Sequence, residues 1–267
     1  MKKLILPIAF LASLLSCKPS GKLTRSVMNS PVIAHRGAFK ANHFPENSIA
    51  SLKHAIQLNC FGSEFDVWMT ADDSLVVNHD PKFHNLEIEK TDFKTLQQFQ
   101  LSNGEPLPTL RNYLRAGLDN NPSTQLILEI KPSNISKERG QIVAVKVVEL
   151  VLAEKASHRT AYISFDFDML VKIRSLLKKA HLQYLNGDKS PAEVRAAGLD
   201  GLDYHFSVFQ KNPDWIDQAK NLGLKLNAWT VNDIGIMNWL LDKKFDYITT
   251  NEPEQLQALV NERSVKK

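Results

Sequence analysis

The sequence predicts one α/β domain over residues 31–262, a single (β/α)8 TIM barrel with a small insertion after its second strand. Two observations predict this fold. From Pro31 onward, short β-branched runs alternate with amphipathic helical stretches, and this rhythm is typical of parallel strands with helices packed outside them. The chain has 267 residues, 43% of them hydrophobic, which is enough for the roughly 250 residues of such a barrel.

Eight runs read as barrel strands, and each is followed by a helical pattern. Strands are expected at 32–35, 62–66, 126–130, 161–164, 182–185, 201–204, 225–229 and 246–249. Helices are expected at 47–58, 110–118, 140–155, 168–179, 191–197, 214–222 and 234–243, with a last one at 254–261 that closes the ring. Gly198 and Gly223 stand where two of these helices need a terminating residue.

A further β-like run, 75–79, follows the second strand too closely to lie parallel to it. Only about four residues, 71–74, separate the two arms, whereas a parallel crossover needs about a dozen. We therefore expect an antiparallel hairpin that brings His79 back beside Glu64 and Phe65. Residues 80–106 then form an insertion above the barrel mouth, in a place where loops commonly set substrate selectivity.

Residues 1–17 have the pattern of a secretory signal. Lys2 and Lys3 precede an apolar run, 4–15, which is too short to remain in a bilayer as a spanning helix. The order Leu14-Leu15-Ser16-Cys17 resembles a bacterial lipobox, which implies lipidation of Cys17; the alternative is a plain secretory signal with an incidental cysteine. With 18–30 as a flexible tether, we expect an exported lipoprotein on the periplasmic or cell-surface side of a bacterial membrane, held there by its lipid anchor alone.

The charge and the cysteines exclude several classes of protein. The formal net charge of +4 includes Lys2 and Lys3, and no basic stripe follows, so no nucleic-acid partner is expected. Cys17 and Cys60 form neither a disulfide framework nor a metal-binding pattern, and Cys60 is expected to be inert in the core. Side chains other than cysteine must carry the chemistry.

Polar residues stand at the carboxyl ends of the expected strands, where the active sites of such barrels lie. Residues i and i+2 of a strand point to the same side, so Glu64 and Asp66 project together, as do Glu129 and Lys131. Three carboxylates then converge and repel one another unless a cation compensates them. Because hard carboxylate oxygens favour Mg²⁺ or Ca²⁺ over softer metals, the sequence predicts a divalent metal as cofactor.

Cationic and imidazole side chains accompany these acids. Arg36 and Lys131 place positive charge beside the metal site, which suits a small-molecule phosphodiester better than a neutral substrate. His35 and His79 lie on neighbouring elements and titrate near neutral pH, so they can act as general base and general acid. A purely structural ion network is the alternative, but burying one without a function is costly.

Taken together, these motifs make the sequence similar to the glycerophosphodiester phosphodiesterases, within the wider group of phospholipase-C-like barrel phosphodiesterases. The resemblance covers 31–256, and its motifs are weak singly but specific in this order and spacing. They are His35-Arg36-Gly37, Pro45-Glu46-Asn47-Ser48, Glu64-Phe65-Asp66 with Thr70 and Asp73, His79-Asp80, Glu129-Ile130-Lys131, Ser164-Phe165, Trp229-Thr230-Val231-Asn232 and Asp246-Tyr247-Ile248-Thr249-Thr250-Asn251-Glu252-Pro253.

The resemblance implies a role for each candidate residue. Metal ligation falls to Glu64, Asp66 and Glu129, acid–base catalysis to His35 and His79, and phosphate contact to Arg36 and Lys131. Glu46 is implied at or just beyond the metal shell. Trp229 is implied in the pocket wall near the leaving group or the glycerol, with packing inside the barrel as its alternative.

Four departures from the family pattern bear on substrate choice more than on chemistry. Ser48 stands where the family usually has Thr, and Ser74 where a turn glycine is common. Residues 38–44 form a longer segment than in compact members, and 81–85, with Lys82 as its one lysine or arginine, differs from the family pattern after the second histidine motif.

The implied reaction is metal-dependent hydrolysis of glycerophosphodiesters to glycerol 3-phosphate and an alcohol. The alternatives are a related enzyme for phosphatidylinositol, lysolipid or another phosphodiester, and a non-catalytic lipoprotein that binds a phosphate ligand. The intact histidines and acids disfavour the latter, and the absence of a His-x-His pair on any strand disfavours an amidohydrolase. The sequence leaves open the alcohol headgroup, the membrane that holds the anchor and the oligomeric state. It also leaves open whether water attacks the phosphorus directly or a cyclic phosphate forms first.

Overall fold

The computed structural model describes residues 30–265. The expected signal segment, the lipidation of Cys17 and all of the tether except Ser30 lie outside the described residues. None of the helices within 30–265 combines the length and apolar character needed to cross a membrane.

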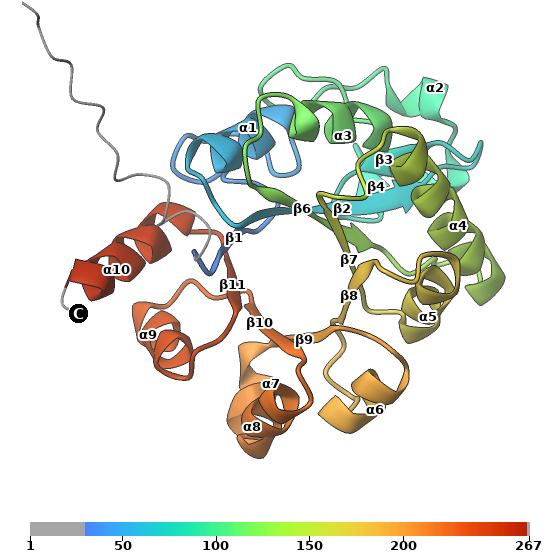
Figure 1. The fold of residues 1–267 in the computed structure, drawn as a ribbon. Coiled ribbons are helices and arrows are strands. Elements are labelled where there is room, and N and C mark those ends of the chain that lie inside the picture. The colour runs from blue at the N-terminus through green and yellow to red at the C-terminus, as the bar shows by residue number, and fades with distance from the viewer. Residues whose placement is uncertain (1–29, 266–267) are drawn as a thin grey trace, which may run out of the picture.

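Eight parallel strands close into a ring, as predicted (Figure 1). In ring order they are β1 (Val32–Ala34), β2 (Gly62–Met69), β6 (Gln125–Ile130), β7 (Thr160–Ser164), β8 (His181–Tyr184), β9 (Gly201–His205), β10 (Lys225–Trp229) and β11 (Tyr247–Thr250). β1 completes the closure because Ile33 pairs with Gly62 on one side and with Thr249 on the other.

Helices lie outside this ring (Figure 1). They are α1 (Ile49–Gln57), α3 (Leu110–Leu118), α4 (Lys137–Ala153), α5 (Phe167–Leu176), α6 (Pro191–Ala196), α7 (Phe206–Lys211), α8 (Asp214–Asn221), α9 (Ile234–Asp242) and α10 (Pro253–Val265). Only α7 has no counterpart among the expected helices.

Two departures from the expected helix bounds have local causes. The side chain of Ser48 accepts a hydrogen bond from Ser51 N and so begins α1 two residues later than expected. Asn47 is thereby left outside the helix with a φ of 59°, where its side chain can serve the site. α4 begins three residues earlier than expected because Ser136 caps it through Arg139 N.

The expected antiparallel hairpin is present, and β2 is longer than expected because its end forms the first arm. β3 (Leu75–Val77) pairs with it outside the ring, with Val67 opposite Val77 and Met69 opposite Leu75. Asn78 N also donates to Asp66 O at 3.0 Å. This register brings His79 back to the level of Phe65, as the turn length predicted.

Residues 80–106 form a compact insertion beyond the ring, beside β2 and β3 (Figure 1). Its short elements are β4 (Lys82–Phe83), β5 (Leu86–Glu87), η2 (Ile88–Lys90) and α2 (Phe93–Leu96). Its buried side chains pack on Trp68 and Val76 as a small core of their own. The Glu105 carboxylate then accepts hydrogen bonds from Ile49 N and Ala50 N at 2.8 and 3.1 Å, which ties the insertion to the first turn of α1.

The core has two layers, because alternate strand residues face in and out. The larger layer fills the space between strands and helices, with Phe65, Leu128 and Tyr204 among its buried members. A smaller apolar group, which includes Ile33 and Ile127, fills the barrel interior. Polar side chains above this inner group, at the carboxyl ends of the strands, are therefore held in a packed frame.

Candidate active site

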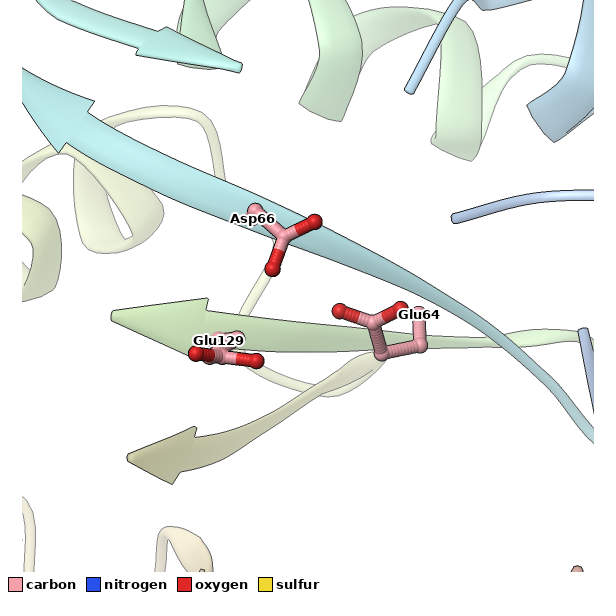
Figure 2. Close-up of side chains that lie close together, drawn as sticks. All are labelled: Glu64, Asp66 and Glu129. Carbon is pink, nitrogen blue, oxygen red and sulfur yellow. The ribbon is translucent and has the colours of Figure 1, made fainter. Parts of the chain in front are cut away.

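Three buried carboxylates form the centre of the site. Glu64 and Asp66 project from β2, and Glu129 projects from the neighbouring β6 (Figure 2). One oxygen from each lies within 4.8 Å of the others, as the alternation of strand residues predicted. Together they can offer oxygen ligands to a divalent cation from three directions.

The charges of this group are strongly perturbed. Burial raises the pKa of Glu64 well above its usual range, and the charges of Asp66 and Glu129 raise it further. Burial likewise raises the pKa of Glu129 to about 7, with the charge of Asp66 as the second cause. Three carboxylates at this distance therefore do not all ionise at neutral pH without added positive charge.

Lys131 supplies part of that charge from inside the site. Its Nζ lies 2.7 Å from Asp66 Oδ1 and 2.8 Å from Glu129 Oε1. Burial alone would raise the pKa of Asp66, but the charges of Lys131 and His79 hold it below its usual value. Asn47 fixes the same carboxylate, since its Nδ2 donates to Asp66 Oδ2 at 2.8 Å and its Oδ1 accepts from Asp66 N at 3.1 Å.

The group fits a hard divalent cation. Glu64 Oε1 is buried and has no hydrogen-bond partner among the described residues, so its desolvation is not compensated by the protein. Lys131 reaches Asp66 and Glu129 but forms no ion pair with Glu64. The possible ligand atoms are all carboxylate oxygens, and Glu64 Oε1 has no partner within residues 30–265. Such a group favours Mg²⁺ or Ca²⁺ over softer metals.

The turn after β1 places Arg36 against this group. Gly37 has a φ of +81°, and a Cβ there would lie 2.3 Å from Ser51 Oγ, so only glycine fits. Arg36 N donates to Glu64 Oε2 at 2.8 Å, and the Arg36 guanidinium pairs with Glu46 at 2.5 Å. Glu46 thus lies beside Arg36 and outside the three-carboxylate group, at the edge of the site.

His35 is fixed in one orientation. Its Nδ1 lies 2.7 Å from Asn251 Oδ1, and its Nε2 lies 3.9 Å from Glu64 Oε2. Burial lowers the pKa of His35 to about 4, and the positive charge of Arg36 adds to that effect. The ring is therefore neutral at pH 7, and donation from Nδ1 to Asn251 leaves a lone pair on Nε2.

His79 is placed differently. It follows β3, its side chain is 37% exposed, and its Nδ1 lies 2.8 Å from Asp80 Oδ1. Its backbone oxygen accepts a hydrogen bond from Trp68 Nε1 at 3.2 Å, which anchors it to β2. The two histidines therefore face one cavity from separate elements, His35 with 16% and His79 with 37% of its side chain exposed.

A small cavity of about 90 Å³, open at its mouth, joins these groups. Seven of the predicted site residues line it, namely His35, Arg36, Glu64, His79, Glu129, Lys131 and Trp229. The Trp229 Nε1 donates to Asp203 O at 2.8 Å, and its ring meets Phe165 and His205 edge to face. Segments 38–44 and 80–106 contribute no residue to this lining, so their role in substrate choice stays a prediction.

The sequence reasoning gave no role to two side chains that matter here. Asn251 orients His35 from the far end of the chain, and Asp203 lines the cavity from β9. For Asp203 a signal was present, because it occupies an inward-facing position of an otherwise apolar strand two residues before His205.

The fold and the site together define a (β/α)8-barrel enzyme with an acidic centre flanked by cationic and imidazole groups. The model of the glycerophosphoryl diester phosphodiesterase family matches residues 35–255, so the chain belongs to that family. It is 30% identical over 250 residues to a glycerophosphodiester phosphodiesterase of Caldanaerobacter subterraneus subsp. tengcongensis, covering 87% of this chain and 98% of the relative.

Solved structures agree with this assignment. A glycerophosphodiester phosphodiesterase from Parabacteroides distasonis superposes with a TM-score of 0.85 at 42% identity, covering 88% of this chain and 98% of the other. A phosphodiesterase from Oleispira antarctica, solved in complex with the product sn-glycerol-3-phosphate, shares the fold at a TM-score of 0.72 and 24% identity, over 88% and 98% of the two chains. The predicted family and the predicted enzyme class, a phosphoric diester hydrolase, are confirmed.

Proposed function

We propose that this enzyme hydrolyses glycerophosphodiesters to glycerol 3-phosphate and an alcohol with the help of Mg²⁺ or Ca²⁺ held by Glu64, Asp66 and Glu129. The observation that carries the proposal is the group of three buried carboxylates with the uncompensated Glu64 Oε1. A bound divalent ion would supply Lewis-acid stabilisation of charge on the phosphoryl oxygens.

The chain's own cations bind the substrate anion. Arg36 and Lys131 both line the cavity and both present N–H donors beside the acids. A phosphodiester carries one negative charge spread over two oxygens, and charge-assisted hydrogen bonds from Arg and Lys bind such a group strongly. The product complex of the Oleispira antarctica relative supports glycerol 3-phosphate as the product here.

The two histidines divide the proton transfers. His35 is neutral at pH 7 with a free Nε2, so it is the general base and takes the proton of the attacking hydroxyl, whether that belongs to water or to the glycerol. His79, hydrogen-bonded to Asp80, is the general acid and gives its proton to the departing alcohol oxygen. The contact between His79 Nδ1 and Asp80 Oδ1 at 2.8 Å fixes the orientation of the His79 ring.

The direct test measures release of glycerol 3-phosphate from glycerophosphocholine and glycerophosphoethanolamine by the full-length protein in detergent. We expect release that a chelator abolishes and that added Mg²⁺ or Ca²⁺ restores. His79→Ala should lower kcat by about a hundredfold or more because the leaving alkoxide is no longer protonated. His158→Ala, an exposed histidine that does not line the cavity, is the matched control.

The remaining outcomes select among the alternatives. Release from phosphatidylinositol or lysolipid micelles but not from the soluble diesters would assign the enzyme to lipid substrates. Binding of glycerol 3-phosphate without turnover under any added metal would contradict the proposed reaction and indicate a binding lipoprotein.

We also propose that the protein is exported and anchored through a lipidated Cys17. The support is the order of charged, apolar and small residues in 1–17. The wild type should partition into the detergent phase and carry a diacylglyceryl mass on its N-terminal peptide. Cys17→Ser should remain uncleaved and unlipidated, and an unmodified Cys17 in the mature wild type would contradict the proposal.

A further inference from the structure

Asp203 is a buried carboxyl group for which neither the fold nor the catalytic steps above have a use. It lies on β9, which stands across the ring from β2 (Figure 1), and it lines the same cavity as Glu64 and Glu129. The residue is 1% exposed, and it lines the site cavity together with Trp229 and Thr249. Its Oδ1 has no hydrogen-bond partner among the described residues.

The neighbours of Asp203 do not satisfy this oxygen. Asn227 lies opposite Asp203 on the neighbouring strand β10, but its amide is engaged with Thr249 Oγ1, at 3.0 Å from Nδ2 and 3.3 Å from Oδ1. Burying a carboxyl oxygen without a partner costs free energy that an apolar residue of similar size would avoid. A group that binds in the cavity would remove this cost.

The surroundings select a hydroxyl group as that partner. Ile163, Phe165, Leu185 and Trp229 form apolar walls in the same cavity, so a charged headgroup would lose its hydration there with little compensation. Burial raises the pKa of Asp203 to about 8, so at neutral pH the carboxyl group is mostly protonated and attracts a cation weakly. A hydroxyl can both donate to and accept from it.

We propose that Asp203 binds a hydroxyl of the substrate's glycerol and makes the site select hydroxylated phosphodiesters over those that lack hydroxyls. The inference rests on the proposed hydrolysis of glycerophosphodiesters and adds to it a specificity-determining contact. Asp203 also fixes the adjoining wall, because its backbone oxygen accepts the hydrogen bond from Trp229 Nε1. A glycerol hydroxyl bound to Asp203 therefore lies next to the indole ring of Trp229.

The test compares two product-like ligands that differ only in hydroxyls, glycerol 3-phosphate and propyl phosphate. Calorimetric titration into the full-length protein, with Mg²⁺ or Ca²⁺ present, gives both dissociation constants without any bond breaking. The wild type should bind glycerol 3-phosphate at least about tenfold more tightly, since a site built for a hydroxyl rejects analogues without it. Asp203→Ala should reduce that ratio to less than threefold and leave the affinity for propyl phosphate unchanged.

Asp203→Asn keeps the size and hydrogen-bonding capacity of the side chain, so it should fold and retain most of the ratio. Asp217→Ala, an exposed aspartate of α8, should keep all of it. An unchanged ratio in Asp203→Ala, equal weakening of both ligands in Asp203→Asn, or no discrimination by the wild type would each overturn the inference. Turnover of glycerophosphocholine by the wild type, measured in parallel, tests the proposed function separately, because the binding ratio does not depend on it.

Discussion

At the scale of single residues, the site is organised by repulsion between carboxylates that the protein itself only partly compensates. Glu64 is the clearest case, because it is buried, lacks a partner for Oε1, and has its pKa raised by burial and by Asp66 and Glu129. A carboxylate in that position destabilises the metal-free fold at neutral pH. Its retention is explained by metal binding rather than by stability.

This reasoning predicts opposite effects of Glu64→Gln on stability and on activity. In chelator at pH 7 the variant should melt at a higher temperature than the wild type, because the amide removes the cost of keeping in the folded state a carboxyl group whose pKa is raised by burial and by Asp66 and Glu129. Its release of glycerol 3-phosphate should fall by about a hundredfold or more, because a ligand of the metal is lost. Thermal unfolding and product assays on one preparation check both effects.

Glu262→Gln, on the exposed part of α10, serves as the control and should change neither property. A lower melting temperature for Glu64→Gln in chelator would show that Glu64 stabilises the metal-free barrel and would contradict this account.

The raised pKa of Asp203 predicts that the free energy of unfolding depends on pH. Its pKa is raised by burial from 3.8 to about 8, with Glu129 as the nearby charge that raises it further. Between these values the folded state keeps a proton that the unfolded state has lost, so stability falls as the pH rises. Relative to Asp203→Asn, the wild type should lose up to about 1.4 kcal/mol per pH unit between pH 5 and 8. Urea unfolding in chelator measures this difference, and parallel pH profiles for the two proteins would refute it.

At the scale of elements, the insertion is joined to the loop that follows β6, the strand that carries Glu129. Glu89 of η2 is buried and accepts hydrogen bonds from Ser133 Oγ at 2.6 Å, Asn134 N at 2.7 Å and Arg139 Nε at 3.3 Å. Arg139 in turn donates to Thr70 O at 2.6 Å, at the end of β2. One carboxylate therefore links the insertion, the loop after β6 and the first turn of α4.

Removing this carboxylate should destabilise the enzyme. Glu89→Ala removes the acceptor shared by Arg139 Nε, Ser133 Oγ and Asn134 N in a mostly buried place, which costs about 3 kcal/mol in the free energy of unfolding. Urea denaturation checks this. Glu87→Ala, which breaks the exposed pair with Lys90 in the same segment, should change the midpoint little. Equal midpoints for the two variants would show that Glu89 does not hold the insertion in place.

Local sequence patterns predict the ring strands and the hairpin but not helix α7. The eight ring strands and the hairpin follow from hydrophobic periodicity and turn length, which are local properties. α7 was missed because Phe206-Ser207-Val208-Phe209 reads as a β-like run. Its helix depends on His205 Nδ1, which accepts from Ser207 N, and on the burial of Phe209 against the rest of the core. Tertiary packing overrides local propensity there.

At the scale of the whole molecule, closure of the ring assembles the site from distant segments. The alternation of strand residues was enough to predict that Glu64, Asp66, Glu129 and Lys131 lie close together. It could not predict the bond between His35 and Asn251, which are 216 residues apart in the chain, because that contact exists only when β11 pairs with β1. Asn251 gains its role from the closed barrel and not from any local pattern.

Closure also makes metal binding a property of the folded molecule as a whole. Glu64 and Asp66 lie on β2 and Glu129 on β6, 63 residues further along the chain, so the unfolded chain offers no such group of ligands. A cation that binds only the folded state stabilises it by about 2.7 kcal/mol when the free cation concentration is one hundred times its dissociation constant.

The melting temperature of chelator-treated wild type should therefore rise with added Mg²⁺ or Ca²⁺, and the cation that raises it at the lower concentration should be the one that supports turnover. Glu129→Gln should remove most of this rise, whereas Glu46→Gln, outside the three-carboxylate group, should retain it. A melting temperature that responds to neither cation would contradict the metal site itself.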